Sequence, residues 1–259
     1  MNLHKILPQF ILKRVYQNIL RHSSPDFDLD VGRNSTPAVL LRLKALGFSP
    51  AHILDIGAFE GKWTAMAAPI FQGASFHLFE ALPYKRVLIE KNLSGIPHQL
   101  YMILLGAENR MEVSYNALES GSGVFPEKTE IKRETLCLPM SRLDSVLNFD
   151  QMIGPVFMKL DVQGYELEVL KGVGNGLKKI DALYLELSTI EYNSGAPSFR
   201  QVIEFLDDHG FNLFDLGESH RKVSDHTLLQ VDGLFLANNS SWYQKACNLS
   251  GKDFRVYSV

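Results

Sequence analysis

The sequence predicts an α/β domain of the doubly wound kind, in which helices cover both faces of a mostly parallel sheet. Three observations favour this class. Short apolar runs alternate with segments of helical spacing from residue 51 to residue 210. A glycine-containing turn joins the first strand and helix of this series, and strand-like runs at 211–216 and 229–236 end it. Such a sheet places its ligand site at the carboxyl ends of its strands.

The series is organised around the sequence I-L-D-I-G-A-F-E-G at residues 53–61. Apolar residues around Asp55 predict a buried strand, Gly57 permits a sharp turn, and Gly61 opens a helix expected at 62–71. A dinucleotide fingerprint would need glycine where the chain has Asp55. A carboxylate there would repel a pyrophosphate but attract the cationic amino-acid head of S-adenosylmethionine. The alternative is an ordinary strand-to-helix turn with a capping Asp.

A second strand is expected at 75–80, and it ends on Glu80 before a helix that begins at Pro83. An acid at this tip accepts hydrogen bonds from both ribose hydroxyls in nucleotide-binding units. Glu80 follows Gly61 by 19 residues, close to the spacing of about 20 that this geometry requires. A simple cap of the following helix is the alternative for Glu80.

A later strand, expected at 156–161, is apolar except for Lys159 and Asp161, which project to the same face. Because burial of a lone ammonium is costly, Lys159 requires a carboxylate partner. A helix expected at 165–172 places Glu166 in its first turn, near the tips of the strands. Glu166 there also meets the positive end of the helix dipole, which allows a purely structural role.

Other segments complete the expected order of elements. The small-residue loop at 119–126 either lies over the site or is a flexible connection. Strands are expected at 99–105, 110–116, 135–140 and 180–187, and helices at 37–46, 83–93, 141–147 and 199–209.

A polar loop is expected at 217–227, between the last two strands. Its oxygen and imidazole groups could bind a metal, but their spacing matches no metal motif, so a solvated loop is favoured and no metal is predicted. The groups are those of Glu218, His220, Asp225 and His226.

Length and composition limit the organisation of the chain. With 259 residues, of which 46% are hydrophobic, it can bury one substantial core. The net charge of -3 offers no basic field for nucleic acid. The cysteines Cys137 and Cys247 form no disulfide or zinc pattern, which suits the cytoplasm. No apolar run approaches the roughly 18 residues of a membrane span.

Residues 1–24 contain basic but no acidic side chains, and their apolar residues have helical spacing. This amphipathic helix could lie on an anionic membrane surface or a partner, or pack on its own domain or a dimer mate, which is the favoured alternative. We therefore predict a helix and linker at 1–35, the main domain at 36–240 and a tail at 241–259.

Three motifs resemble the FkbM-type methyltransferases, which have the class I fold. They are F-E-A-L-P at 79–83, R-L-D-S-V-L at 142–147 and M-K-L-D-V-Q-G-Y-E-L-E-V-L-K-G at 158–172. The resemblance covers about residues 51–236. It implies a seven-stranded Rossmann-like sheet with an antiparallel C-terminal strand, S-adenosylmethionine as cofactor, and O-methylation of a saccharide or natural-product hydroxyl. Phe59 and Gln163 stand where the family often has Asn and an acid.

The expected cofactor site combines the glycine turn, the acid of the second strand and the tip of the later strand. Its residues are Asp55, Gly57, Ala58, Phe59, Gly61, Glu80, Ala81 and Asp161. 

The expected catalytic residues are Asp161, Glu166 and Lys159. Asp161 would accept the hydroxyl proton or orient the acceptor, with Lys159 and Glu166 as its charged surroundings. Alternatively, Asp161 could hold the methionine end of the donor. A metal ion bound by carboxylates could also lower the pKa of the acceptor hydroxyl. The expected partner is a small-molecule or glycan acceptor, and a homo-oligomer is a further option.

Two rival functions belong to other classes. A non-catalytic module could bind the cofactor and dock on a biosynthetic partner or membrane through residues 1–24. A dehydrogenase is disfavoured by Asp55, which replaces a glycine of the dinucleotide fingerprint.

Overall fold

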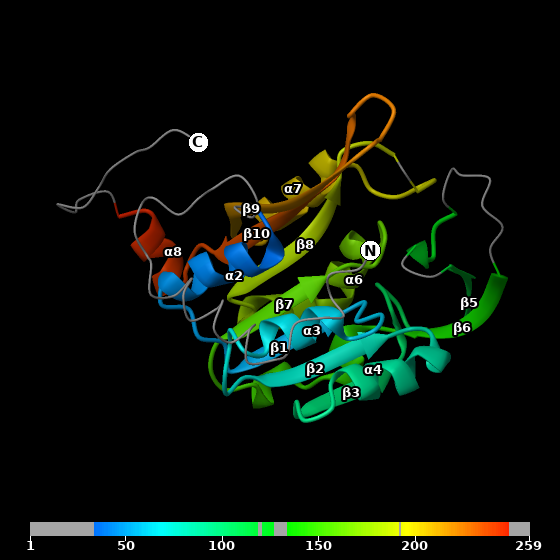
Figure 1. The fold of residues 1–259 in the computed structure, drawn as a ribbon, viewed down its shortest axis with the longest axis horizontal. Helices are drawn as coiled ribbons and strands as arrows, with labels where there is room; N and C mark the ends of the chain where they lie inside the picture. Colours follow the sequence, from blue (N-terminus) through cyan, green and yellow to red (C-terminus); the bar gives the residue numbers. More distant parts are fainter. Residues whose placement is uncertain (1–33, 119–120, 127–133, 192, 249–259) are drawn as a thin grey trace, which may run out of the picture. The chain divides into compact units, whose positions relative to one another are not determined.

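A computed structural model describes residues 34–118, 121–126, 134–191 and 193–248. Its main sheet has seven strands, six parallel and one, β10, antiparallel to its neighbours (Figure 1). This confirms the predicted fold class. In spatial order the strands are β3 (His98–Met102), β2 (Ser75–Glu80), β1 (His52–Ile56), β7 (Val156–Leu160), β8 (Ala182–Ser188), β10 (Leu228–Ala237) and β9 (Phe211–Arg221).

Helices cover both faces of this sheet, as a doubly wound fold requires (Figure 1). One face carries α2 (Thr36–Ala45), α3 (Lys62–Ala67), η2 (Pro83–Lys85) and α4 (Arg86–Asn92). The other carries α5 (Leu143–Val146), η4 (Phe149–Gln151), α6 (Glu166–Val173), η5 (Gly174–Lys179) and α7 (Phe199–Asp208).

The central strands β1, β2, β7 and β8 are buried along most of their length. All five residues of β7 are buried, Lys159 among them, and four of the five residues of β1. Apolar side chains supply the free energy of this burial, at about 25 cal/mol per Å² removed from water. The carboxyl ends of the central strands are therefore held rigidly, and the chain segments that follow them start from defined positions.

A second sheet of three strands was only partly expected. It contains β4 (Leu104–Leu105), β6 (Glu134–Ser141) and β5 (Arg110–Ala117) in this order. The single strand expected at 99–105 is wrong, because the chain divides at Ile103 between the two sheets. The Ile103 N–H donates to the Glu80 carbonyl, and Leu104 then pairs with Met140 of β6.

The hairpin of β9 and β10 also differs from the expectation. β9 continues to Arg221, so the first half of the loop expected at 217–227 is strand. His220 pairs with Gln230 and Ser219 with Val231 in this extension. Its side chains are mostly exposed, so no apolar alternation revealed the strand in the sequence.

Some expectations fall partly or wholly outside the described residues. The helix and linker expected at 1–35 lie there except for residues 34 and 35, as do residues 249–259 of the tail. Residues 241–246 of the tail form α8 (Ser241–Ala246), and the Trp242 ring contacts Phe48. Among the described helices, none is long and apolar enough to cross a membrane.

Candidate functional site

A cleft opens at the carboxyl ends of β1, β2 and β7, where the glycine turn faces the three-stranded sheet. Five of the predicted site residues line it: Gly57, Phe59, Glu80, Ala81 and Asp161. Further lining residues come mainly from the three-stranded sheet and its loops: Leu82, Ile103, Leu104, Leu105, Tyr115, Ser122, Val124, Gln163 and Tyr165. Predicted residues Asp55, Ala58, Gly61, Lys159 and Glu166 do not line this cleft.

Close backbone contacts hold the glycine turn and leave no space for a side chain at position 57. Gly57 has a φ of +75°, and a Cβ on it would lie 1.9 Å from the Asp161 carbonyl oxygen. The N–H groups of Gly57 and Ala58 both donate to the Phe79 carbonyl. Phe59 also has a positive φ, which is uncommon for a residue with a side chain. The turn thus lies closer to the backbone of Asp161 than a residue with a side chain would permit.

Glu80 ends β2 and connects the turn to the start of η2. Its carboxylate accepts hydrogen bonds from the Phe59 N–H at 2.8 Å and the Leu82 N–H at 2.9 Å. Burial raises the pKa of Glu80, although these two N–H donors oppose the shift. Each carboxylate oxygen has a second lone pair, so Glu80 retains acceptor capacity toward the cleft.

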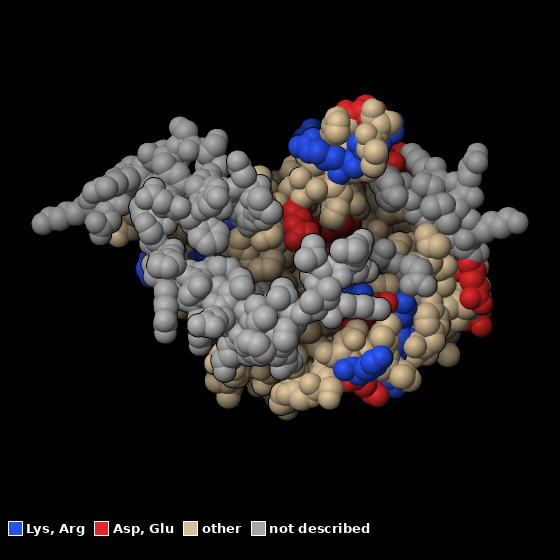
Figure 2. Space-filling view, viewed as in Figure 1, with Lys and Arg blue, Asp and Glu red and all other residues tan. Residues whose placement is uncertain are grey.

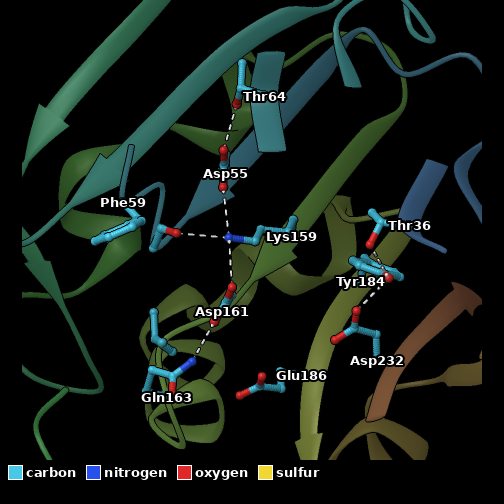
Figure 3. A network of polar contacts seen from close by, with 12 residues as sticks. Thr36, Asp55, Phe59, Thr64, Lys159, Asp161, Gln163, Tyr184, Glu186 and Asp232 are labelled. Atoms are coloured by element: carbon cyan, nitrogen blue, oxygen red, sulfur yellow. Dashed lines mark hydrogen bonds and ion pairs between the residues drawn. The ribbon is translucent and has the colours of Figure 1, made fainter. Parts of the chain in front are cut away.

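A network of charged side chains joins Asp55 and Lys159 to Asp161 of the cleft (Figure 3). Asp55 accepts a hydrogen bond from the Thr64 hydroxyl at 2.7 Å, and its other oxygen lies 3.2 Å from Lys159 Nζ. Lys159 also donates to the Gly57 carbonyl at 2.9 Å. The carboxylate partner predicted for Lys159 is therefore confirmed and is Asp55. A direct contact between Asp55 and the amino group of the donor stays a prediction. Such a contact would require the Asp55–Lys159 pair to rearrange.

The protonation of Lys159 follows from the same contacts. Burial disfavours its charged form, but the neighbouring carboxylates Asp55 and Asp161 outweigh burial and raise its pKa. The ammonium therefore stays charged beneath the cleft. It binds the Gly57 turn and the tips of β1 and β7 together.

Asp161 follows β7 and reaches the cleft. Its side chain is 45% exposed, and its Oδ2 lies 3.7 Å from Lys159 Nζ. The Gln163 amide donates to its other oxygen at 3.1 Å (Figure 3). Gln163 has a φ of +55°, and its carbonyl accepts a hydrogen bond from Asn193. Asp161 is thus a carboxylate held on both sides that still faces open space.

Glu166 organises the turn that carries Gln163. One of its carboxylate oxygens accepts hydrogen bonds from the Val162 N–H at 3.0 Å and the Gly164 N–H at 3.2 Å. Burial raises its pKa to about 7, despite these N–H donors. This matches the structural alternative considered for Glu166, while its catalytic role stays a prediction.

Two further carboxylates lie near Asp161 and were not among the predicted site residues. Glu186 of β8 and Asp232 of β10 are directly opposite each other in the antiparallel pair. Burial raises the pKa of Asp232 to about 6 and that of Glu186 well above its ordinary value, with Asp161 adding to both shifts. Figure 2 shows acidic side chains gathered in a hollow beside the β9–β10 hairpin.

The contacts of Asp232 extend to the start of α2. The Tyr184 hydroxyl donates to Asp232 at 2.8 Å and also contacts the Thr36 hydroxyl (Figure 3). Among the described residues, no group of three or more His, Cys, Asp or Glu side chains is arranged to hold a metal ion.

Sequence reasoning missed the residues that reach the cleft from the three-stranded sheet. Tyr115 had no signal, because its position depends on the pairing of β5 with β6. The loop expected to lie over the site did carry a signal in its small residues, and its Ser122 and Val124 do line the cleft. The strand-end carboxylate Glu186 was visible in the sequence, but its pairing with Asp232 was not.

The chain was compared with known proteins by sequence and by structure. No curated protein is significantly similar to the chain in sequence. Among solved structures, precorrin-6y C5,15-methyltransferase from Geobacter metallireducens GS-15 aligns with 82% of this chain and 93% of its own, at 14% identity and a TM-score of 0.44. Cofactor-bound Rv0187 from MTB aligns with 88% of this chain and 90% of its own, at 12% identity and a TM-score of 0.45.

The domain match is more specific than these structural likenesses. Residues 55–213, more than half of the chain, match the methyltransferase FkbM domain. The protein is therefore a methyltransferase with S-adenosylmethionine as its cofactor. The chain belongs to the FkbM methyltransferase domain family.

Proposed function

We propose that this methyltransferase transfers the methyl group to a hydroxyl of a saccharide or natural-product acceptor. The observation that carries this proposal is Asp161, a half-exposed carboxylate in the cleft that is anchored by Lys159 and Gln163. A hydroxyl must lose its proton when it is methylated, so a carboxylate within reach of the acceptor supplies general-base catalysis.

The cleft suits S-adenosylmethionine by the chemistry of its lining. Glu80 offers carboxylate acceptors for a ribose diol, and the apolar residues Leu82, Ile103 and Leu104 offer surfaces for a flat base. When bound, the cofactor supplies an electrophilic methyl group on a sulfonium. We assign Glu80, Ala81 and the Gly57 turn to donor binding, since they line one continuous part of the cleft.

The roles of Asp161 and its neighbours follow from the contacts. Gln163 and Lys159 hold the carboxylate in one orientation, which lowers the entropy lost when an acceptor hydroxyl is aligned. Asp161 then accepts the hydroxyl proton or orients the hydroxyl by hydrogen bonding. Lys159 is a positioning residue, because it lies beneath the cleft and does not line it.

The acceptor class is inferred from the charge around Asp161. Asp232 lies near it and, with a pKa of about 6, is mostly ionised at neutral pH; ionised carboxylates accept hydrogen bonds from polyols while repelling phosphate groups. A neutral hydroxylated acceptor therefore fits this side of the cleft better than a strongly anionic one.

The direct test is a transfer assay with a panel of acceptors. The protein is incubated with S-adenosylmethionine and neutral glycosides, deoxysugar nucleotides and polyhydroxylated natural products, and each acceptor is examined by mass spectrometry. We expect a mass gain of one methyl on a hydroxyl of a saccharide or natural-product acceptor. Tight binding of S-adenosylmethionine without transfer to any acceptor would contradict the proposal and favour a non-catalytic cofactor-binding module.

A further inference from the structure

Tyr115 is a polar side chain enclosed in the apolar core of the three-stranded sheet. It lies on β5 and packs with Leu82, Leu104, Ala117 and Met140. Only 7% of its surface is exposed, yet it lines the cleft. A tyrosine whose ring is buried usually keeps its hydroxyl where a hydrogen-bond partner can reach it, and for Tyr115 that place is the cleft.

The Tyr115 hydroxyl forms no hydrogen bond to any residue that the structure describes. Burial raises the pKa of this hydroxyl well above its ordinary value, and the negative charge of Glu80 adds to the shift. Both side chains line the same cleft, but no direct hydrogen bond joins them. The hydroxyl is therefore a neutral O–H donor beside the carboxylate assigned to the donor's ribose.

We propose that the Tyr115 hydroxyl hydrogen-bonds the adenosine part of S-adenosylmethionine, beside the ribose that Glu80 binds. This inference rests on the donor site proposed above and extends it to the three-stranded sheet. That sheet then contributes to recognition of the donor as well as covering one end of the cleft.

The surroundings of Tyr115 favour adenosine over the acceptor. Leu82, Leu104 and Val124 share the cleft with Tyr115, and apolar side chains of this kind suit the faces of a purine. The anchored carboxylate of Asp161 marks a different, polar part of the lining, contributed by the chain after β7. A purine has ring nitrogens that accept a hydrogen bond, and the ribose has hydroxyls, so a tyrosine O–H has partners in either part of adenosine.

The test is Tyr115→Phe, which removes one oxygen atom and keeps the ring that packs in the core. Binding is measured by calorimetry with S-adenosylhomocysteine and by ligand-observed NMR with adenosine alone. Both dissociation constants should rise by the same factor, about 2- to 10-fold, as expected for one neutral hydrogen bond.

Tyr101→Phe is the matched control. Tyr101 donates to Gln99 on β3 and does not line the cleft, so the same loss of one hydroxyl should leave both dissociation constants unchanged. Circular dichroism and the thermal transition confirm that each variant is folded.

Several results would overturn the inference. The first is that Tyr115→Phe binds both ligands as the wild type does. The second is that it binds S-adenosylhomocysteine more weakly but adenosine equally well. The third is that its KM for the acceptor rises while its donor affinity stays unchanged. In each case, the assignment of the donor site still holds if Glu80→Ala weakens donor binding. If neither variant affects donor binding, the donor site itself is wrong.

Discussion

Lys159 Nζ lies 3.2 Å from Asp55 Oδ1, and both side chains are buried. The ion pair joins neighbouring strands, since Asp55 on β1 is directly beside Lys159 on β7. Lys159 also binds the Gly57 carbonyl and approaches Asp161, so one ammonium group supports the glycine turn and the anchored carboxylate of the cleft. These contacts support the cleft, while the catalytic role predicted for Lys159 and the donor contact predicted for Asp55 stay predictions.

Replacement of Lys159 tests this support. Lys159→Met keeps the length of the side chain but leaves Asp55 buried without its counter-charge. We expect the free energy of unfolding to fall by about 3–5 kcal/mol, the usual cost of a buried ion pair that loses one partner. Urea denaturation measures the change. Lys171→Met is the control, because its pair with Glu168 is partly exposed to solvent and should contribute under about 1 kcal/mol.

Asp161→Asn tests the proposed base. The substitution keeps the shape of the side chain and removes the negative charge that would accept a proton. We expect donor binding to be unchanged and methyl transfer to fall by about 10²- to 10⁴-fold, the usual contribution of a general base. Asp150→Asn, at an exposed position paired with Lys179, should leave transfer unchanged. A parallel loss of donor binding would instead place Asp161 in the cofactor site.

Glu80→Ala tests the ribose contact. Loss of the carboxylate should weaken S-adenosylhomocysteine binding by about 1–3 kcal/mol, as expected for hydrogen bonds to a charged group. Calorimetry measures this difference. The control is Glu90→Ala, since Glu90 is an exposed residue of α4 that pairs with Arg86. Equal affinities of the Glu80 variant and the wild type would remove Glu80 from the donor site.

The pH dependence of stability tests the environment of Glu166. Burial raises its pKa from 4.5 to about 7, so the folded state binds a proton more tightly than the unfolded state. The resulting stabilisation is complete below about pH 4.5 and is lost as the pH rises through about 7. The wild type should therefore lose about 3 kcal/mol relative to Glu166→Gln over this window. Urea denaturation at several pH values checks this, and parallel curves for the two proteins would contradict it.

Deletion of residues 1–24 tests the predicted domain organisation. Their basic, amphipathic pattern forms a separate unit in the sequence, so the truncated protein should fold and bind S-adenosylhomocysteine like the full chain. Circular dichroism and calorimetry measure both properties. An unfolded truncated protein would show that this helix belongs to the core of the domain.

Local patterns in the sequence were sufficient for the order of the main strands and helices and for part of the site. Buried strands and the helices between them have distinct periods of apolar residues, so their alternation predicts the doubly wound sheet. Gly57 and Glu80, which both line the cleft, were singled out because each stands at a fixed place relative to a strand end. The need of Lys159 for a carboxylate followed from the cost of burying an isolated charge.

Other features depend on contacts between distant segments, and only the tertiary structure decided them. The register of β1 against β7 selects Asp55 as the partner of Lys159. The break at Ile103 sends the chain into a second sheet, whose pairing carries Tyr115 to the cleft beside Glu80. The pairing of β8 with β10 likewise brings Glu186 opposite Asp232. Strand pairing joins residues far apart in the chain, and local periodicity carries no information about which strands pair or in which register.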